Sequence, residues 1–224
     1  MSYSRDKAKS GWLVSFGDLV TLLITLFILV LVMNKSELSK VQVWSSELLD
    51  NTVRSLNISL DSFKYVSVKR TMQGIEVDIL MNNSFIKGGF EPVKRFRGEL
   101  QKLGVILGEM PFLVKENGGI PEDILLLSQK NGLVFVRKIS VSGHTDNDAI
   151  NPNSALRNNW FLSSMRAQSV MNILFEASSL SPELFIASGF GENRPIVPNS
   201  TEENKQKNRR IQIEITANFE KIPN

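Results

Sequence analysis

The sequence contains no cysteine and a single histidine among its 224 residues. Without cysteine the chain can form no disulfide, no thiolate metal site and no cysteine nucleophile. One histidine, His144, also argues against a histidine-built metal site within one chain. Long basic runs are missing too, and charges of both signs are mixed to a net charge of +3, so a nucleic-acid partner is not expected. What remains informative is the distribution of apolar residues, which form 42% of the chain and suffice for a folded core.

Residues 12–33 form an almost wholly apolar stretch with one charge, Asp18. A helix of that length rises about 33 Å, enough to cross a hydrocarbon core of about 30 Å. Arg5, Lys7 and Lys9 precede it, and this excess of basic residues predicts a cytoplasmic N-terminus. A cleavable signal peptide fits poorly, because the stretch is long, carries a charge and is followed by no A-x-A site. We therefore expect residues 1–11 in the cytoplasm, a transmembrane helix over 12–33, and the rest of the chain outside.

Asp18 is the unusual residue of this span, since a carboxylate in a bilayer segment costs about 2.5–3.5 kcal/mol on insertion scales. One alternative is that Asp18 reaches the cytoplasmic interface, although its short side chain is poorly suited to that. At about 100° per residue, Ser15, Asp18, Thr21 and Thr25 lie within about 120° of one another on the helix. Such a polar stripe indicates an ion path or a helix–helix seam. Because a lone helix cannot shelter a charge, partner helices are expected around Asp18.

Residues 34–61 are expected to form a connector. Leu38, Val41, Trp44 and Leu48 recur at helical spacing and predict an amphipathic helix. Such a helix could be a solvated connector or a short dimer coil. It could also lie on the membrane or block a pore until the complex is engaged. The pattern does not separate these interpretations.

From residue 62 the pattern changes to that of an α/β domain spanning residues 62–224. Strands are predicted at 64–70, 74–80, 133–143, 184–191 and 209–217, and helices at 92–107 and 158–177. We expect Phe161, Met165, Val170 and Leu174 to face the core, and residues 108–131 to be less regular. Alternating strands and helices predict a sandwich of helices packed on a mixed sheet.

Four blocks of this domain resemble the OmpA C-terminal peptidoglycan-binding domain: VSGHTD (141–146), NNWFLSSMRAQSV (158–170), SGFGENRP (188–195) and NRRIQIEI (208–215). The form of the second block, NNWxLSxxRA, is similar to that of flagellar stator B subunits of the MotB/PomB type. The span agrees, since WLVSFGDLVTLL resembles the stator pattern W-x-x-x-[FY]-A-D-[LFM]-M-[ST], with Gly17 and Val20 as departures. The resemblance thus covers both ends of the chain.

The resemblance implies roles for particular residues. Asp18, with Thr21 and Thr25 nearby, would bind and release the coupling ion, either H⁺ or Na⁺. In the exported domain, Asp146 and Arg166 occupy the positions that bind diaminopimelate in the family. Carboxylate and guanidinium facing one another could clamp its ammonium and carboxylate groups. Further site residues at matching positions are Asn159, Thr145 and Arg209.

The implied function is that of an ion-conducting stator subunit in the bacterial inner membrane, with a periplasmic C-terminal domain bound to peptidoglycan. Its partner would be a multi-span A-type channel subunit of the MotA/PomA kind, as a pentamer around a dimer of this chain. The connector is short for a flagellar stator, and residues 108–131 look like an insertion. A subunit of a Zorya-type anti-phage defence motor and a purely structural wall tether are therefore kept as alternatives.

An enzyme is not expected, because no serine or carboxylate completes a catalytic group with His144. His144 is interpreted as a structural residue at a strand end, and Trp160 as a core residue rather than a platform for sugars. Gly189 and Gly191 are interpreted as turn glycines, since no phosphate-binding glycine motif occurs. No cofactor or bound metal is expected.

Overall fold

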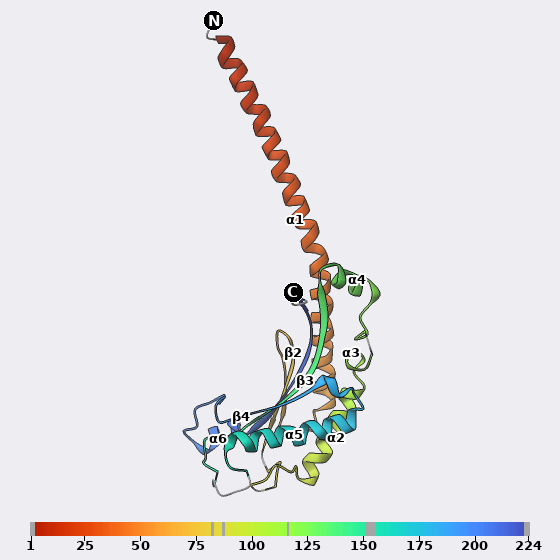
Figure 1. Ribbon diagram of the computed structural model, residues 1–224, viewed down its shortest axis with the longest axis vertical. Helices are drawn as coiled ribbons and strands as arrows, with labels where there is room; N and C mark the ends of the chain where they lie inside the picture. The colour runs from red at the N-terminus through yellow and green to blue at the C-terminus, as the bar shows by residue number, and fades with distance from the viewer. Residues whose placement is uncertain (1–2, 82, 87, 116, 151–155, 222–224) are drawn as a thin grey trace.

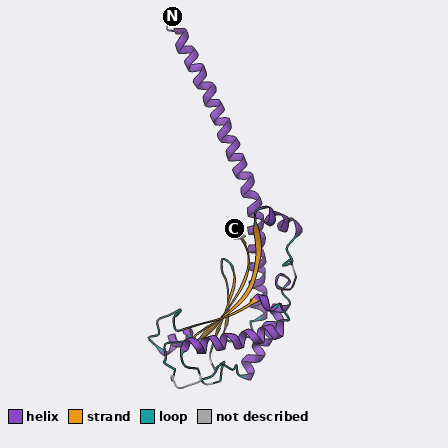
Figure 2. Cartoon of the chain, viewed as in Figure 1, coloured by secondary structure: helices purple, strands orange, loops and turns teal. Residues whose placement is uncertain are grey.

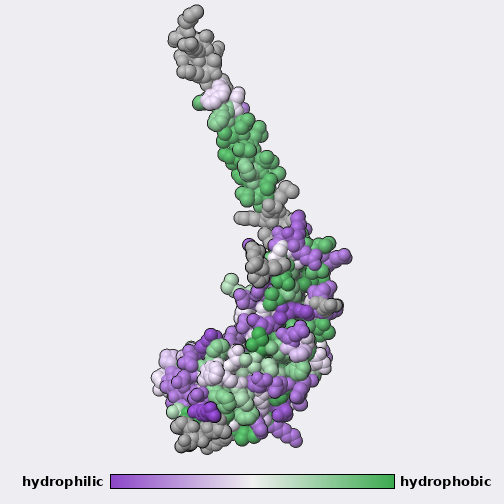
Figure 3. All heavy atoms as spheres, in the orientation of Figure 1, coloured by the Kyte–Doolittle hydropathy of each residue, from purple (hydrophilic) through white to green (hydrophobic). Residues whose placement is uncertain are grey.

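One long helix forms the N-terminal part of the molecule. The computed structural model describes residues 3–81, 83–86, 88–115, 117–150 and 156–221, although the side chains of 3–11 and 33–38 are not among those described. Helix α1 runs from Tyr3–Ser59 and projects far beyond the rest of the chain (Figure 1). Its segment Trp12–Val32 has a mean hydropathy of 2.4, is nowhere buried, and is long and apolar enough to cross a membrane. Figure 3 shows most of this segment as a green apolar band, with pale and purple residues at its N-terminal end.

A five-stranded mixed sheet forms the centre of the folded domain. Its strands are β1 (Val66–Arg70), β2 (Gly74–Leu80), β3 (Leu133–His144), β4 (Phe185–Gly191) and β5 (Arg210–Lys221). The spatial order is β1-β2-β5-β3-β4, and only the β3–β4 pair is parallel. All five strands match predicted strands, and the alternating Ile211, Ile213 and Ile215 are fully buried as expected.

The main helices α2 (Lys94–Gly108) and α5 (Asn159–Ser178) contact one another and cover the sheet (Figure 2). Both were predicted. Residues 108–131, expected to be less regular, contain two short helices that were not predicted, α3 (Pro111–Val114) and α4 (Glu122–Lys130). A 3₁₀ turn at Pro182–Leu184 and a short helix α6 (Glu202–Asn208) complete the described elements.

The connector is not a separate element, because it continues α1 without a break. Its inward face packs against the folded domain: Leu49, Leu56 and Leu60 belong to the main core. Val41 and Trp44 join a second cluster with Ile120 and Ile124 of the α4 region, with aromatic contacts that extend to β3 and β5. Of the predicted apolar face, Val41 is buried and Trp44 and Leu48 are half-buried, whereas the Leu38 side chain lies outside those described.

Helix α5 turns a different face to the sheet than its large residues suggest. Val170 and Leu174 are buried as predicted, but Phe161 is 37% exposed and Met165 is half-buried. The reason is close approach: a Cβ on Gly143 would lie 2.2 Å from the Ser163 carbonyl oxygen. Small residues, including Ser163 and Ala167, must therefore face the strands. Trp160 is 60% exposed, so its assignment to the core was wrong.

Candidate functional site

The polar stripe of the membrane span lies on the exposed part of α1. The Thr21 hydroxyl donates to the backbone carbonyl oxygen of Asp18 at 2.8 Å, and the Thr25 hydroxyl donates to that of Leu22 at 2.8 Å. Both threonines thus satisfy their protons within the helix and keep their oxygen lone pairs as acceptors. The Asp18 side chain is exposed on the helix surface beside them. This arrangement offers oxygen ligands to a cation or a proton carrier once neighbouring helices enclose it.

The second site lies where β3 ends. His144 is the last strand residue, and Thr145 and Asp146 follow it, all three buried. The Thr145 N–H donates to the Gly191 carbonyl oxygen at 2.9 Å, which ties the end of β3 to the end of β4. The Asp146 carboxylate accepts the N–H of Asp148 at 3.1 Å, a local turn that fixes its direction.

Arg209 is the direct cationic partner of Asp146. It follows α6, and its guanidinium donates both to Asp146 and, at 2.6 Å, to Glu202. Partial burial lowers the pKa of Arg209, but the hydrogen bonds to Glu202 and Asp146 outweigh it and leave the pKa raised. Arg209 therefore stays positively charged, and its guanidinium is held beside the Asp146 carboxylate.

Arg166 lies near Asp146, and its own contacts are with other groups. Its Nε donates to the Gly89 carbonyl oxygen at 3.1 Å, and its guanidinium lies 4.9 Å from the centre of the Phe85 ring. Burial lowers the pKa of Arg166 to about 10, an effect that the charge of Asp146 opposes. Asp146 therefore has Arg209 as its direct partner, and Arg166 lies within electrostatic range of it. The predicted clamp of Asp146 and Arg166 on diaminopimelate stays a prediction.

Asn159, at the start of α5, links the loops of the site. Its side-chain amide donates to the backbone carbonyl oxygens of Asp146 at 3.3 Å and Asp148 at 2.9 Å, and to Glu192 at 2.6 Å. The Thr145 hydroxyl is buried, and no hydrogen bond of it is recorded among the described residues. The structure thus gathers all five predicted residues at one end of the sheet.

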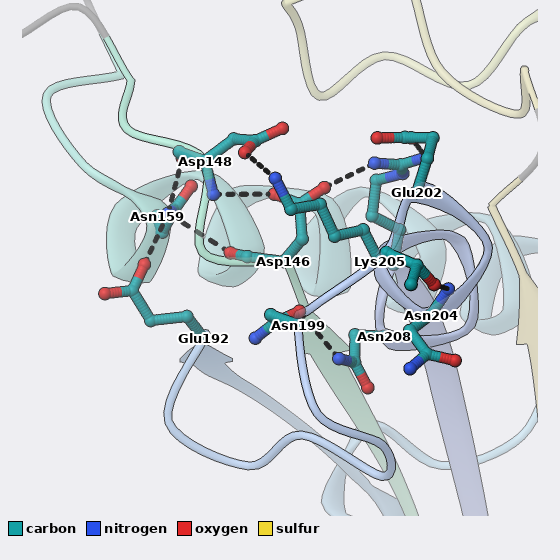
Figure 4. A network of polar contacts seen from close by, with 11 residues as sticks. Asp146, Asp148, Asn159, Glu192, Asn199, Glu202, Asn204, Lys205 and Asn208 are labelled. Atoms are coloured by element: carbon teal, nitrogen blue, oxygen red, sulfur yellow. Dashed lines mark hydrogen bonds and ion pairs between the residues drawn. The ribbon is translucent and has the colours of Figure 1, made fainter.

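Four further charged residues belong to this network, Asp148 among them, and sequence reasoning missed them. Lys205 of α6 donates to Asp148 at 2.6 Å, Glu202 holds Arg209, and Glu192 holds Asn159 (Figure 4). Glu192 and Asp148 lie in or beside the blocks that carried the resemblance. Lys205 and Glu202 gave no such signal, because the short helix α6 was not expected.

His144 is buried beneath the Asp146 site, so its ring is not accessible to a substrate. It is 2% exposed, and its ring stacks on Phe190 with centroids 5.4 Å apart. Burial, together with the charges of Arg210 and Arg194, lowers the pKa of His144 to about 4. His144 therefore stays neutral at ordinary pH, in keeping with a structural role. Gly191 adopts φ +54 at the strand end, whereas Gly189 lies within β4 and not in a turn as expected.

Comparisons with known protein families match the N-terminal helix and the folded domain separately. Residues 126–209 match the OmpA family, and residues 3–51 match the family described as membrane MotB of the proton-channel complex MotA/MotB. The chain is thus similar to MotB at its N-terminal helix and to the OmpA family in its folded domain. Neither family is one of enzymes, which agrees with the expectation that the chain is not an enzyme.

The relatives differ in how much of this chain they match. Motility protein B of Bacillus subtilis is 41% identical over 95 residues, which are 41% of this chain and 36% of that protein. The uncharacterized protein YtxE of Bacillus subtilis is 28% identical over 225 residues, covering 96% of this chain and 91% of YtxE. The first match thus spans about a third of its relative, and the second spans nearly all of it.

A solved structure supports the fold. The crystal structure of a putative MotB-like protein from Desulfovibrio vulgaris aligns with a TM-score of 0.58 at 17% identity, covering 80% of this chain and 98% of that one. The prediction of one N-terminal apolar helix followed by an OmpA-like α/β domain is thereby confirmed.

Proposed function

We propose that this chain is the ion-carrying, wall-anchored subunit of a membrane motor. Helix α1 crosses the bacterial inner membrane with its N-terminus in the cytoplasm, and the folded domain lies in the periplasm. H⁺ or Na⁺ flows past Asp18, and the site around Asp146 holds peptidoglycan so that the subunit stays fixed.

The observation that carries this proposal is Asp18 on the exposed apolar surface of the span. A structural tether needs only an apolar anchor. A carboxylate within the membrane raises the free energy of insertion and would add nothing to such a tether. With Thr21 and Thr25 beside it, Asp18 forms the polar part of an otherwise apolar helix. Enclosing that stripe requires partner helices, and the similarity of residues 3–51 to the MotB family supports a MotA-like multi-span partner around two copies of this chain.

The exported site supports wall anchoring. Asp146 offers a buried carboxylate, and Arg209 and Arg166 place two guanidinium groups near it. Diaminopimelate in the peptide stem carries an ammonium and carboxylates, which such a pair of charges can bind together. Asn159 and Thr145 hold the loop that carries Asp146 and supply further polar atoms.

Flagellar rotation is the favoured output because of the local identity with motility protein B of Bacillus subtilis. The match along nearly the whole chain to YtxE, which is uncharacterized, supports a MotB-like protein without pointing to flagella. A Zorya-type defence motor would use the same parts, whereas a structural tether would use the wall site alone.

The test is Asp18→Asn in the native host. Asn is nearly isosteric and polar, so insertion and partner binding should persist, but it cannot release a proton or neutralise a cation. We expect motor output to stop while membrane levels and co-purification with the multi-span partner stay normal. Swimming reports a flagellar motor, and protection against phage reports a defence motor.

Asp6→Asn is the matched control, since it makes the same chemical change before the span. It should leave output unchanged. Full output in the Asp18→Asn strain at normal expression would remove the ion-carrier proposal and leave a wall tether.

A further inference from the structure

A hollow of about 290 Å³ lies beside the Asp146 site, and an exposed tryptophan lines it. Trp160, in the first turn of α5, is 60% exposed. The other lining residues are mostly polar: Arg157, Asn158, Asn159, Glu192 and Asn193, with Ala149 and Ile150. A lone exposed apolar side chain needs no explanation, but an indole beside several hydrogen-bonding groups in a concave surface is the composition of a ligand site.

The chemistry of this hollow fits a sugar ring. A pyranose presents C–H groups on its faces and hydroxyl or acetamido groups around its edge. The indole of Trp160 offers a large flat apolar surface, and aromatic contacts of this kind are worth about 0.5–1.5 kcal/mol beyond the area they bury. Glu192 and Asn193 supply an acceptor and an amide at the rim. Glu192 already accepts from Asn159 at 2.6 Å, so its carboxylate is oriented before a ligand arrives.

The hollow and the Asp146 site share a residue. Asn159 lines the hollow and at the same time donates to the backbone carbonyl oxygens of Asp146 and Asp148 (Figure 4). In peptidoglycan the diamino acid is the third residue of a stem that starts on the sugar. Three extended residues span roughly 10 Å. A stem whose diamino acid reaches Asp146 therefore brings its sugar into the neighbourhood of Asn159.

We propose that this hollow is a glycan subsite in which Trp160 stacks on an N-acetylated amino sugar of the strand that bears the bound stem. Glu192 and Asn193 bind the polar edge of the ring. This inference rests on the proposed wall binding and adds to it a second part of the ligand. The domain would then recognise the junction of stem and glycan rather than a free peptide.

The experiment compares two soluble ligands on the full chain in detergent micelles. One is the tripeptide L-Ala-D-Glu-diaminopimelate, and the other is the same tripeptide attached to its disaccharide of N-acetylglucosamine and N-acetylmuramic acid. We expect the disaccharide form to bind the wild-type chain about three- to tenfold more tightly. Trp160→Ala should bring this ratio near one and leave tripeptide binding within about twofold, whereas Trp160→Phe should keep most of the gain.

Phe161→Ala is the matched control, because Phe161 is a neighbouring exposed aromatic residue of α5 that does not line the hollow. It should leave the ratio unchanged. If the wild-type chain binds the tripeptide but gains nothing from the sugar, or if Trp160→Ala weakens both ligands equally, the glycan subsite is wrong and wall binding stands. If the wild-type chain binds neither ligand, the wall-binding proposal fails and this inference fails with it.

Discussion

At the scale of single residues, the two oxygens of Asp146 have different partners. One accepts the N–H of Asp148, and the other accepts from Arg209. Asp146 is only 6% exposed, so its carboxylate oxygens are satisfied by these partners and by any ligand that reaches them. Asp148 has a different setting, because its side chain is largely exposed and its ion pair with Lys205 is at the surface. The two carboxylates, two positions apart, should therefore differ strongly in their contribution to binding.

We expect Asp146→Ala to weaken binding of the full chain to purified peptidoglycan sacculi by at least about tenfold, because removing one member of a buried charge pair costs about 2–5 kcal/mol. The double change Asp146→Ala, Arg166→Ala should abolish binding. Asp148→Ala is the control and should cost less than about fivefold, since exposed pairs contribute about 0–1 kcal/mol. Co-sedimentation measures binding, and circular dichroism checks the fold. Wild-type binding by the double variant would place the wall site elsewhere.

His144 makes the folding stability depend on pH. Its folded pKa is lowered to about 4 from an ordinary value of 6.5, so the unfolded chain takes up a proton first as pH falls. The contribution is fully present above pH 6.5 and is lost between about pH 6.5 and 4, to a total of up to about 3 kcal/mol. His144→Gln should remove this part of the pH dependence. Unfolding by denaturant at pH 7 and pH 4.5 measures it, and an equal pH dependence in both proteins would contradict the assignment.

The sequence motifs identified five residues that the structure gathers at one end of the sheet, but they did not predict which of them pair. Asp146, Arg166 and Arg209 lie in blocks whose order is typical of the family. Strand and helix periodicity predicted the elements that carry those blocks. Which guanidinium meets Asp146 depends on α6, because Glu202 orients Arg209 towards the carboxylate. A seven-residue polar helix has no apolar periodicity, so its contribution was not visible in the sequence.

At the scale of elements, α1 serves two environments with one continuous helix. Its first half is exposed and apolar, and its second half packs into the folded domain through Leu49, Leu56 and Leu60. The sequence predicted both helical stretches, since each has a clear apolar pattern. It could not show which surface the second stretch contacts, because an amphipathic face suits a membrane, a pore or a protein core equally well.

Leu56 tests this docking. It is fully buried, so Leu56→Ala should lower the free energy of unfolding of the domain by about 2–5 kcal/mol. Ile58, two residues later, is 79% exposed, and Ile58→Ala should change stability by no more than about 0.5 kcal/mol. The fluorescence of Trp44, between α1 and the sheet, can follow unfolding of the full chain in detergent. Equal effects of the two substitutions would mean that α1 is not docked in solution.

Small residues explain why the face of α5 was misjudged. Gly143 of β3 and Gly189 of β4 lie against Ser163 and Ser164, where a Cβ would come within 2.2 Å of the helix. Phe161 and Trp160 are thereby left on the exposed side. Hydrophobic size predicts burial in most helices, but here the closest contact with the sheet requires residues with little volume.

At the scale of the whole molecule, the structure places the two candidate sites at opposite ends. Val41 and Trp44 lie near the start of β3 and the end of β5, close to the membrane span, whereas Asp146 follows the far end of β3. From the end of the span to Val41 the helix rises only about 14 Å, and β3 adds at most about 40 Å. If residues 41–59 left the domain as extended chain, they would span roughly 60 Å in place of about 28 Å as a helix. Docking of α1 therefore sets how far the Asp146 site lies from the membrane span.

A reversible lock on α1 tests whether the docked arrangement limits anchoring. The Ser45 hydroxyl donates to the carbonyl oxygen of Ala217 in β5 at 3.4 Å, and the native chain has no cysteine. A Ser45→Cys, Ala217→Cys pair should therefore form a single disulfide between α1 and the sheet. We expect this lock to stop motor output in cells and reduction to restore it, because the domain cannot extend towards the wall while α1 is held. The purified locked chain should still bind soluble peptidoglycan fragments, since Asp146 lies at the other end of β3. Each single-cysteine variant serves as the control, and undiminished output from a fully cross-linked chain would make the docked arrangement the working form of the motor subunit.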